Sequence, residues 1–173
     1  MISYISNAAH YERIVRKSLD VKTHLWIGTA DIKDLYVQDG LQGSTPYLSA
    51  LNRLLQRKVE VKILCAKTPG ENFQRDLKKF PLLYKHLELV KCLRVHFKLF
   101  IFDLNEVYIG SANLTGAGIG MKSKNKRNFE AGILTDEAVL VEQAINQFDE
   151  VWNGSMCTAC QRKEFCEMPI SNM

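Results

Sequence analysis

The residues in this sequence that are best suited to chemistry stand at fixed offsets inside a short apolar segment. They follow the spacing H-x-K-x4-D-x6-G-S-x-N and comprise His96, Lys98, Asp103, Gly110, Ser111 and Asn113. An imidazole can supply a nitrogen nucleophile and a lysine a cation for non-bridging oxygens, while hydroxyl and amide donors bind more strongly as negative charge develops. Together these groups suit attack on a phosphodiester.

Alternation along the chain predicts that four of these side chains converge. In the run 94–102, His96 and Lys98 share one parity, while the residues between them and after them are apolar. A strand that is apolar on both faces is a central strand, where an ionisable pair needs a cleft or partners. Ser111 and Asn113 share a face of the next predicted strand, after a turn. Alone, His96 could be a core histidine and Lys98 could snorkel from a strand end; the combination favours a site.

Two acidic residues have weaker individual signals. Asp103 lies at the predicted turn 103–106, where an aspartate is common for turn formation, and a buried ion pair is an equal alternative. Glu130 belongs to an Asn128-x-Glu130 pair that opens another predicted strand. Alone, Glu130 would be interpreted as an exposed carboxylate at a strand end.

The spacing from His96 to Asn113 resembles the signature of the phospholipase D superfamily, whose members cut or transfer phosphodiester bonds through a phosphohistidine. The resemblance is specific from residue 96 to 130 and only architectural over the rest of residues 1–153. It implies that Glu130 accepts a hydrogen bond from the ring of His96 and orients it. The catalytic set implied by the resemblance is His96, Lys98, Asp103, Ser111, Asn113 and Glu130, with Lys98, Asn113 and Asn128 binding the phosphate.

Only one copy of the signature is present. In the family, two copies meet across a two-fold or pseudo-two-fold axis, where one histidine attacks phosphorus and the other protonates the leaving oxygen. By resemblance to the half-size members, we expect a homodimer with one active site at its interface and His96 contributed by each subunit. The chemistry implied by the resemblance needs no cofactor.

A basic segment between the signature and Glu130 bears on the substrate. Lys122, Lys124, Lys126 and Arg127 place four cations within six residues, and the net charge is +4. A basic rim beside a phosphodiesterase site suits DNA or RNA, although a solvated loop is the alternative. We therefore expect an endonuclease. A phospholipase or phosphatidyltransferase acting on a lipid phosphodiester stays open, as does a nucleic-acid-binding subunit that joins a partner in a defence or restriction system.

Three of the five cysteines lie in the tail, as Cys157-x2-Cys160-x5-Cys166. C-x2-C is a common thiolate clamp for zinc or an iron–sulfur cluster, and a closed site needs a fourth ligand. The candidates for that ligand are Cys65, Cys92, His86 and a residue of a second subunit. Reduced thiols, or a disulfide formed during purification, are the alternative. Any metal here would be structural.

The order of patterns predicts an α/β fold, a mixed β-sheet flanked by helices on both faces. Predicted helices cover 6–19, 45–55, 68–85 with a break at Pro81, and 136–152. Predicted strands cover 24–29, 59–65, 88–92, 94–102, 107–113 and 131–134, and 31–43 is a predicted loop. We expect one catalytic domain, 1–153, and a cysteine-containing tail, 154–173. Without an apolar run of about 18 residues or a secretion signal, we expect no membrane span and a cytoplasmic location.

Overall fold

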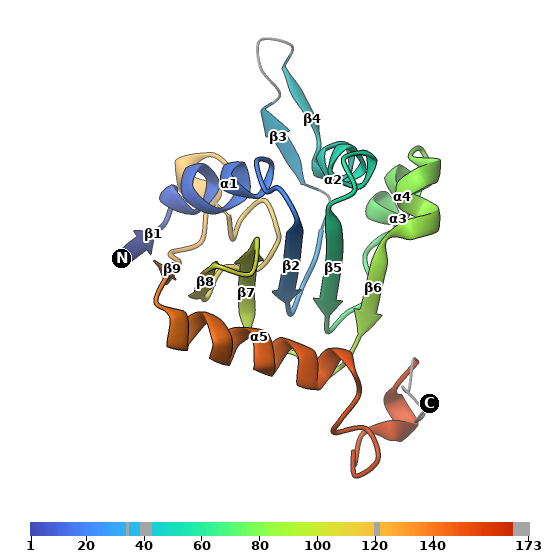
Figure 1. Ribbon diagram of the computed structural model, residues 1–173. Coiled ribbons are helices and arrows are strands. Elements are labelled where there is room, and N and C mark those ends of the chain that lie inside the picture. Colours follow the sequence, from blue (N-terminus) through green and yellow to red (C-terminus); the bar gives the residue numbers. More distant parts are fainter. Residues whose placement is uncertain (34, 39–42, 120–121, 168–173) are drawn as a thin grey trace.

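The computed structural model describes residues 1–33, 35–38, 43–119 and 122–167. Its centre is a seven-stranded mixed sheet with the strand order β1-β9-β8-β7-β2-β5-β6 (Figure 1). These strands are β1 (Ile2–Ser6), β2 (His24–Thr29), β5 (Glu60–Cys65), β6 (Glu88–Lys91), β7 (Lys98–Phe102), β8 (Glu106–Gly110) and β9 (Ala131–Thr135). Strands β2, β5 and β6 run parallel, and every other neighbouring pair is antiparallel.

Helices cover both faces of the sheet, as the sequence predicts. Figure 1 shows α5 (Ala138–Trp152) below the strands and the other helices above them. The latter are the π-helical turn Tyr11–Val15, which continues into α1 (Arg16–Ser18), then α2 (Tyr47–Gln56), α3 (Glu71–Leu77) and α4 (Pro81–His86). A short ladder of β3 (Tyr36–Gln38) and β4 (Ser44–Pro46) precedes α2. No helix in the described ranges is long and apolar enough to cross a membrane.

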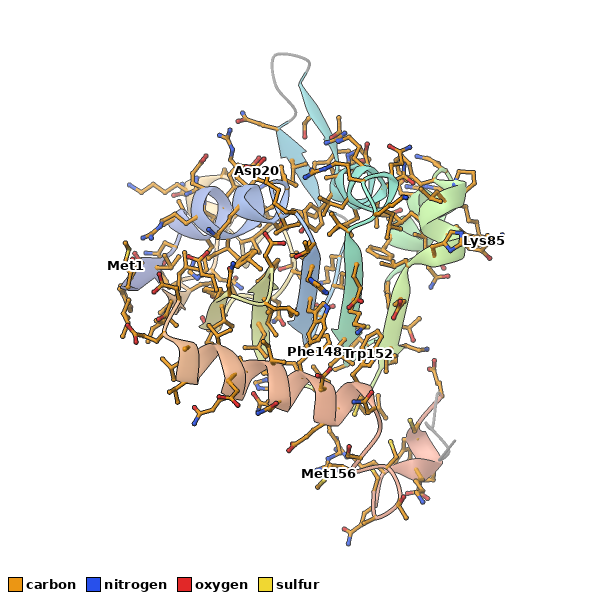
Figure 2. The ribbon with its side chains drawn as sticks, in the orientation of Figure 1. Met1, Asp20, Lys85, Phe148, Trp152 and Met156 are labelled. Atoms are coloured by element: carbon orange, nitrogen blue, oxygen red, sulfur yellow. The ribbon has the colours of Figure 1, made fainter. Side chains whose placement is uncertain are left out.

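Helix α5 is held by an apolar stripe at helical spacing. Val141, Ala144 and Phe148 are buried against the sheet. The ring of Phe148 stacks on Trp26 of β2 and on Trp152, with centroids 5.1 and 5.7 Å apart. Figure 2 shows Phe148 and Trp152 projecting from α5 toward the strands. Full burial of a side chain such as Phe148 stabilises the fold by roughly 1.5–3 kcal/mol, so this contact fixes the helix on its face.

Strand β7 lies at the centre and is buried at all five positions. Leu99 and Ile101 belong to the core on the α5 side, and Phe100 belongs to the opposite core. Lys98, which has the parity of Phe100, faces that opposite side and pairs in register with Gly110 of β8. The sequence therefore assigned the faces of this strand correctly.

Two glycines make room beside this central strand. A Cβ atom at Gly132 would lie 2.3 Å from Cε2 of Tyr108, and one at Gly110 would lie 2.5 Å from Cζ of the same ring. Tyr108 is fully buried, so its ring cannot move aside to make room for an added Cβ atom. The two glycines thus let an aromatic ring lie flat over the sheet next to Lys98.

Strand ends differ from the sequence prediction. Strand β7 begins at Lys98, because residues 92–95 form a turn closed by a bond from the Val95 N–H to the Cys92 carbonyl, so His96 precedes the strand. Strand β8 ends at Gly110, and Ser111 and Asn113 lie beyond it. The alternating pattern of side chains in the sequence continues beyond Gly110, where the registered pairing of β8 with β7 and β9 ends. Strand β1 was not predicted, and the first predicted helix begins late because Asn7 adopts a left-handed conformation (φ 47°).

Candidate active site

His96 and Lys98 meet at the end of the sheet where β7 begins. The Lys98 Nζ donates to the carbonyl oxygen of His96 at 2.6 Å and lies 3.4 Å from its Nε2. His96 is exposed, whereas Lys98 is buried, and burial lowers the pKa of Lys98 while the negative charge of Glu130 raises it. The pair therefore presents an accessible nitrogen next to a cation that the backbone holds in place.

Glu130 sits beside this pair in a chain of hydrogen bonds. Ser111 Oγ donates to one carboxylate oxygen of Glu130, and Asn128 Nδ2 donates to the other at 3.0 Å. Ser111 Oγ also accepts from the Ala131 N–H at 3.1 Å, and the Ser111 N–H donates to the Ala131 carbonyl at 2.9 Å. These bonds continue the pairing of β8 and β9 past the end of β8. Ser111 and Glu130 are thereby fixed side by side.

Asn113 ties the site to the end of β2. Its Oδ1 accepts hydrogen bonds from the backbone N–H groups of Ala30 and Asp31, each at 3.1 Å, and lies 3.3 Å from Oγ1 of Thr29. The amide oxygen is thus fully used inside the protein. The amide nitrogen remains as the donor that a phosphate oxygen could use.

The expected hydrogen bond between Glu130 and the His96 ring is not formed within one chain. Both residues lie in the described part of the molecule, and the Glu130 carboxylate accepts from Ser111 and Asn128 instead. Glu130 acts on the pair through its charge, which favours the charged form of Lys98. The correction is one of connection: Lys98 stands between the two groups that the resemblance would join directly.

Asp103 lies away from the other candidates. It follows the last residue of β7, whereas Lys98 is the first, and five residues of strand span about 16 Å. Its Oδ1 accepts hydrogen bonds from the backbone N–H groups of Lys22, Thr23 and His24 at 2.9, 2.7 and 3.1 Å. Burial raises the pKa of Asp103, but these hydrogen bonds outweigh it and lower the pKa overall. Asp103 therefore fastens a turn (φ 49°) to the preceding loop and is removed from the candidate catalytic set.

Two residues behind Glu130 escaped the sequence analysis. Asn7 donates its N–H to the Glu130 carbonyl at 2.9 Å and accepts the Glu130 N–H on Oδ1 at 3.2 Å. The carbonyl of Asn7 bonds in turn to Nδ1 of His10 at 2.8 Å, and that ring packs edge-on against Tyr108 with centroids 5.4 Å apart. Burial lowers the pKa of His10, while the Asn7 bond and the Glu130 charge raise it. No local pattern could reveal these contacts, because 123 residues separate Asn7 from Glu130.

The basic segment returns to the site. Lys124–Lys126 form a short 3-10 helix, Arg127 Nε donates to the Lys122 carbonyl at 2.5 Å, and the chain then reaches Asn128. The three lysines Lys122, Lys124 and Lys126 are exposed. None of the four cations forms a salt bridge with a described residue. Their charge is free to act on an anion that approaches Glu130 and His96.

The tail cysteines lie elsewhere. Cys157, Cys160 and Cys166 follow α5 and face residues 90–94, upstream of His96. They therefore take no part in the group around Glu130, and their arrangement is described below.

Comparisons with known proteins agree with this fold. A family model described as "Cardiolipin synthase, PLD-like domain" matches residues 5–152, a match that ends with α5. No curated protein matches the chain by sequence. The solved structure of NucT from Helicobacter pylori is 13% identical with a TM-score of 0.61, over 87% of this chain and 95% of its own. Nuc from Salmonella typhimurium, a phospholipase D family member, is 18% identical with a TM-score of 0.60, over 88% of this chain and 94% of its own.

A lipid-related structure is similar to the same degree. Phosphatidylserine synthase from Haemophilus influenzae Rd KW20 is 17% identical with a TM-score of 0.62, over 86% of this chain and 36% of its own. At such identities the likeness to these structures concerns the fold alone.

Proposed function

The chain belongs to the phospholipase D superfamily, and on that premise we propose that it is a phosphodiesterase in which His96 is the nucleophile. The observation that carries the proposal is the approach of Lys98 Nζ to within 3.4 Å of the exposed His96 Nε2. A phosphate placed against this nitrogen would have a cation at its non-bridging oxygens.

The proposed reaction has two steps. The Nε2 atom of His96 attacks phosphorus, forming a P–N bond as the bond to the leaving oxygen breaks, and that oxygen takes a proton from a general acid. A water molecule then gives a proton to the group that acted as the acid and is now a base, and its oxygen attacks phosphorus, breaks the P–N bond and releases a phosphomonoester. Lys98 and Nδ2 of Asn113 bind the oxygens on which negative charge develops. Glu130, held by Ser111 and Asn128, balances the charge of Lys98.

We infer that the general acid comes from outside the chain. His10 is the histidine nearest to Glu130 in the described network, but it is only 1% exposed and its pKa is lowered by burial. We therefore propose that His96 of a second copy donates the proton, so that the active site forms between two subunits.

Exposed apolar side chains on neighbouring strands near the β1 edge of the sheet offer a surface for a second copy. Tyr4, Ile133 and Ile109 are directly opposite one another on β1, β9 and β8, and so share a face of the sheet. They are 72%, 42% and 39% exposed, and Phe129, next to Glu130, is 96% exposed. Apolar side chains gathered in this way mark contact surfaces. We propose that a second copy packs against this row.

We further propose that the substrate is DNA or RNA. The support is the run of cations from Lys122 to Arg127, which form no salt bridge with a described residue. This run leads directly to the Asn128–Glu130 pair. Each cation placed on a backbone phosphate releases counterions, so binding should weaken as salt rises. The similarity to phosphatidylserine synthase makes a lipid phosphodiester the second candidate.

Cleavage in EDTA tests both the chemistry and the substrate class. Labelled single- and double-stranded DNA, RNA, and phospholipid vesicles would be compared for the wild type, His96→Ala, and the control His86→Ala, which alters an exposed histidine on α4. We expect cleavage of a nucleic acid by the wild type and the control, and none by His96→Ala. Vesicle hydrolysis alone would move the substrate to lipid. Activity that survives in His96→Ala would overturn the mechanism.

A further inference from the structure

Four cysteines surround one small cavity beside the segment that precedes His96. The cavity, of about 40 Å³, lies between the tail and the segment after β6, and Cys92, Cys157, Cys160 and Cys166 all line it. All four are free and partly buried. The sequence left the partner of the three tail cysteines open among several candidates, and the fold brings Cys92 to them.

Local backbone structure turns these sulfurs toward a common space. The Cys160 N–H donates to the Cys157 carbonyl at 3.1 Å, which closes a turn around the C-x2-C pair. The Cys166 N–H donates to the Lys163 carbonyl at 3.1 Å, and the Cys92 carbonyl accepts from Val95 at 2.9 Å. Each cysteine therefore stands at a tight turn, as thiolate ligands of structural metal sites commonly do.

Positive charge surrounds the same cavity. Lys91, Arg94, Arg162 and Lys163 line it together with the cysteines. Four thiolates around one divalent cation carry an excess of negative charge, and the surrounding cations would offset it.

The tail also lacks a core of its own. No described residue after Trp152 belongs to either hydrophobic cluster, and Met156 and Phe165 are 56% and 64% exposed. Figure 2 places Met156 in this tail, beyond the end of α5. A segment that buries so little apolar surface needs another source of stability to hold one conformation, and small units of this kind commonly use a metal.

We propose that Cys92, Cys157, Cys160 and Cys166 bind one Zn²⁺ ion that fastens the tail to the body of the protein. As the described side chains lie, no three potential ligands converge tightly enough to hold an ion, so binding must draw the sulfurs inward across the cavity. The four thiols lose their protons on binding. A single tetrahedral ion held by four thiolates has Zn–S distances of about 2.3 Å.

Metal content of the purified full-length chain tests the proposal. The protein would be prepared under reducing conditions with zinc in the growth medium, and its zinc and iron measured by mass spectrometry. Variants are Cys92→Ser, Cys160→Ser and the control Cys65→Ser, whose cysteine is buried on β5 and does not line the cavity. We expect about one zinc per chain in the wild type and control, and a loss of zinc in the other two variants.

Thiol reactivity of the wild type gives a second reading that does not depend on variants folding. The four thiols that line the cavity should resist a thiol reagent in native protein until a chelator is added, and the released zinc should appear together with them. The buried thiol of Cys65 should stay unreactive in native protein with or without the chelator. Wild type without zinc, full zinc retention in Cys92→Ser, or an iron–sulfur absorption spectrum would each overturn the proposal. A disulfide among the four, detected by mass under reducing preparation, would overturn it as well.

Discussion

The variants Asn113→Asp and Asn113→Ala should separate the structural task of this side chain from its proposed chemical task. The oxygen of Asn113 accepts from the N–H groups of Ala30 and Asp31, and the nitrogen is the proposed donor to phosphate. Asn113→Asp keeps an oxygen acceptor and removes the donor. Asn113→Ala removes both.

The magnitudes follow from these contacts. In Asn113→Ala two partly buried N–H groups lose their acceptor, at about 1 kcal/mol each, or about 2 kcal/mol in total. For a chain of this length each kcal/mol lowers Tm by about 2–4 °C, so Tm should fall by about 4–8 °C. Asn113→Asp should stay within about 2 °C of the wild type. Both should lose about 10²–10³ in kcat, the usual loss when one donor to developing negative charge is removed.

Thermal unfolding and single-turnover cleavage, measured on the same preparations, check the two effects. Asn146→Asp, an exposed position on α5, introduces the same charge elsewhere and should leave both quantities unchanged. Cleavage by Asn113→Asp at the wild-type rate would refute the role in phosphate binding. A fall in Tm as large as that of Asn113→Ala would refute the assignment of the oxygen to the loop.

Three further outcomes are expected. Asp103→Ala should lower Tm at pH 7 but much less at pH 3. Hydrogen bonds lower the pKa of Asp103 in the folded state, so the stabilisation that its carboxylate provides is lost as the pH falls below about 4. An equal fall in Tm at both pH values would contradict this. Gly132→Ala should lower Tm by about 2–12 °C, because the added Cβ overlaps the buried Tyr108 ring. The control Gly70→Ala should change Tm little, because a Cβ at Gly70 has no heavy atom within 4 Å. Equal changes of Tm in calorimetry would argue against the overlap. Ile133→Lys should convert the proposed dimer into an inactive monomer, as measured by light scattering and a cleavage assay. The control Tyr84→Lys, at an exposed position on α4, should leave the dimer intact. A dimeric Ile133→Lys variant would count against the proposed interface.

Local patterns were enough for much of the fold. Strand β2 and the helix break at Pro81 match the prediction, as does most of α5, because apolar periodicity and a proline act within a few residues. The face of Lys98 was also predictable from parity alone. These features depend on neighbours in sequence.

The parts that were not predicted depend on distant partners. The ends of β7 and β8 are set by where adjacent strands stop pairing, which the alternation in Ser111 and Asn113 does not encode. Asp103 has the residue type and spacing of the signature, yet its hydrogen bonds go to a loop about 80 residues away. Asn7 carried no signal at all, since its importance lies only in its contact with Glu130.

The pairing of β1 with β9 has a consequence for how the protein is made. Strand β1 stands at the edge of the sheet and its neighbour is β9. The hydrogen bonds between Asn7 and Glu130 therefore cannot form before Glu130 has been synthesised. The 123 residues from Ala8 to Glu130 take roughly 6–25 s at about 5–20 residues per second. Between the addition of Lys98 and that of Glu130, the nascent chain contains His96 and Lys98 but not the carboxylate beside them. The hydrogen-bonded group around Glu130 can thus assemble only after residue 130 has been synthesised, well after the sheet's central strands have been made.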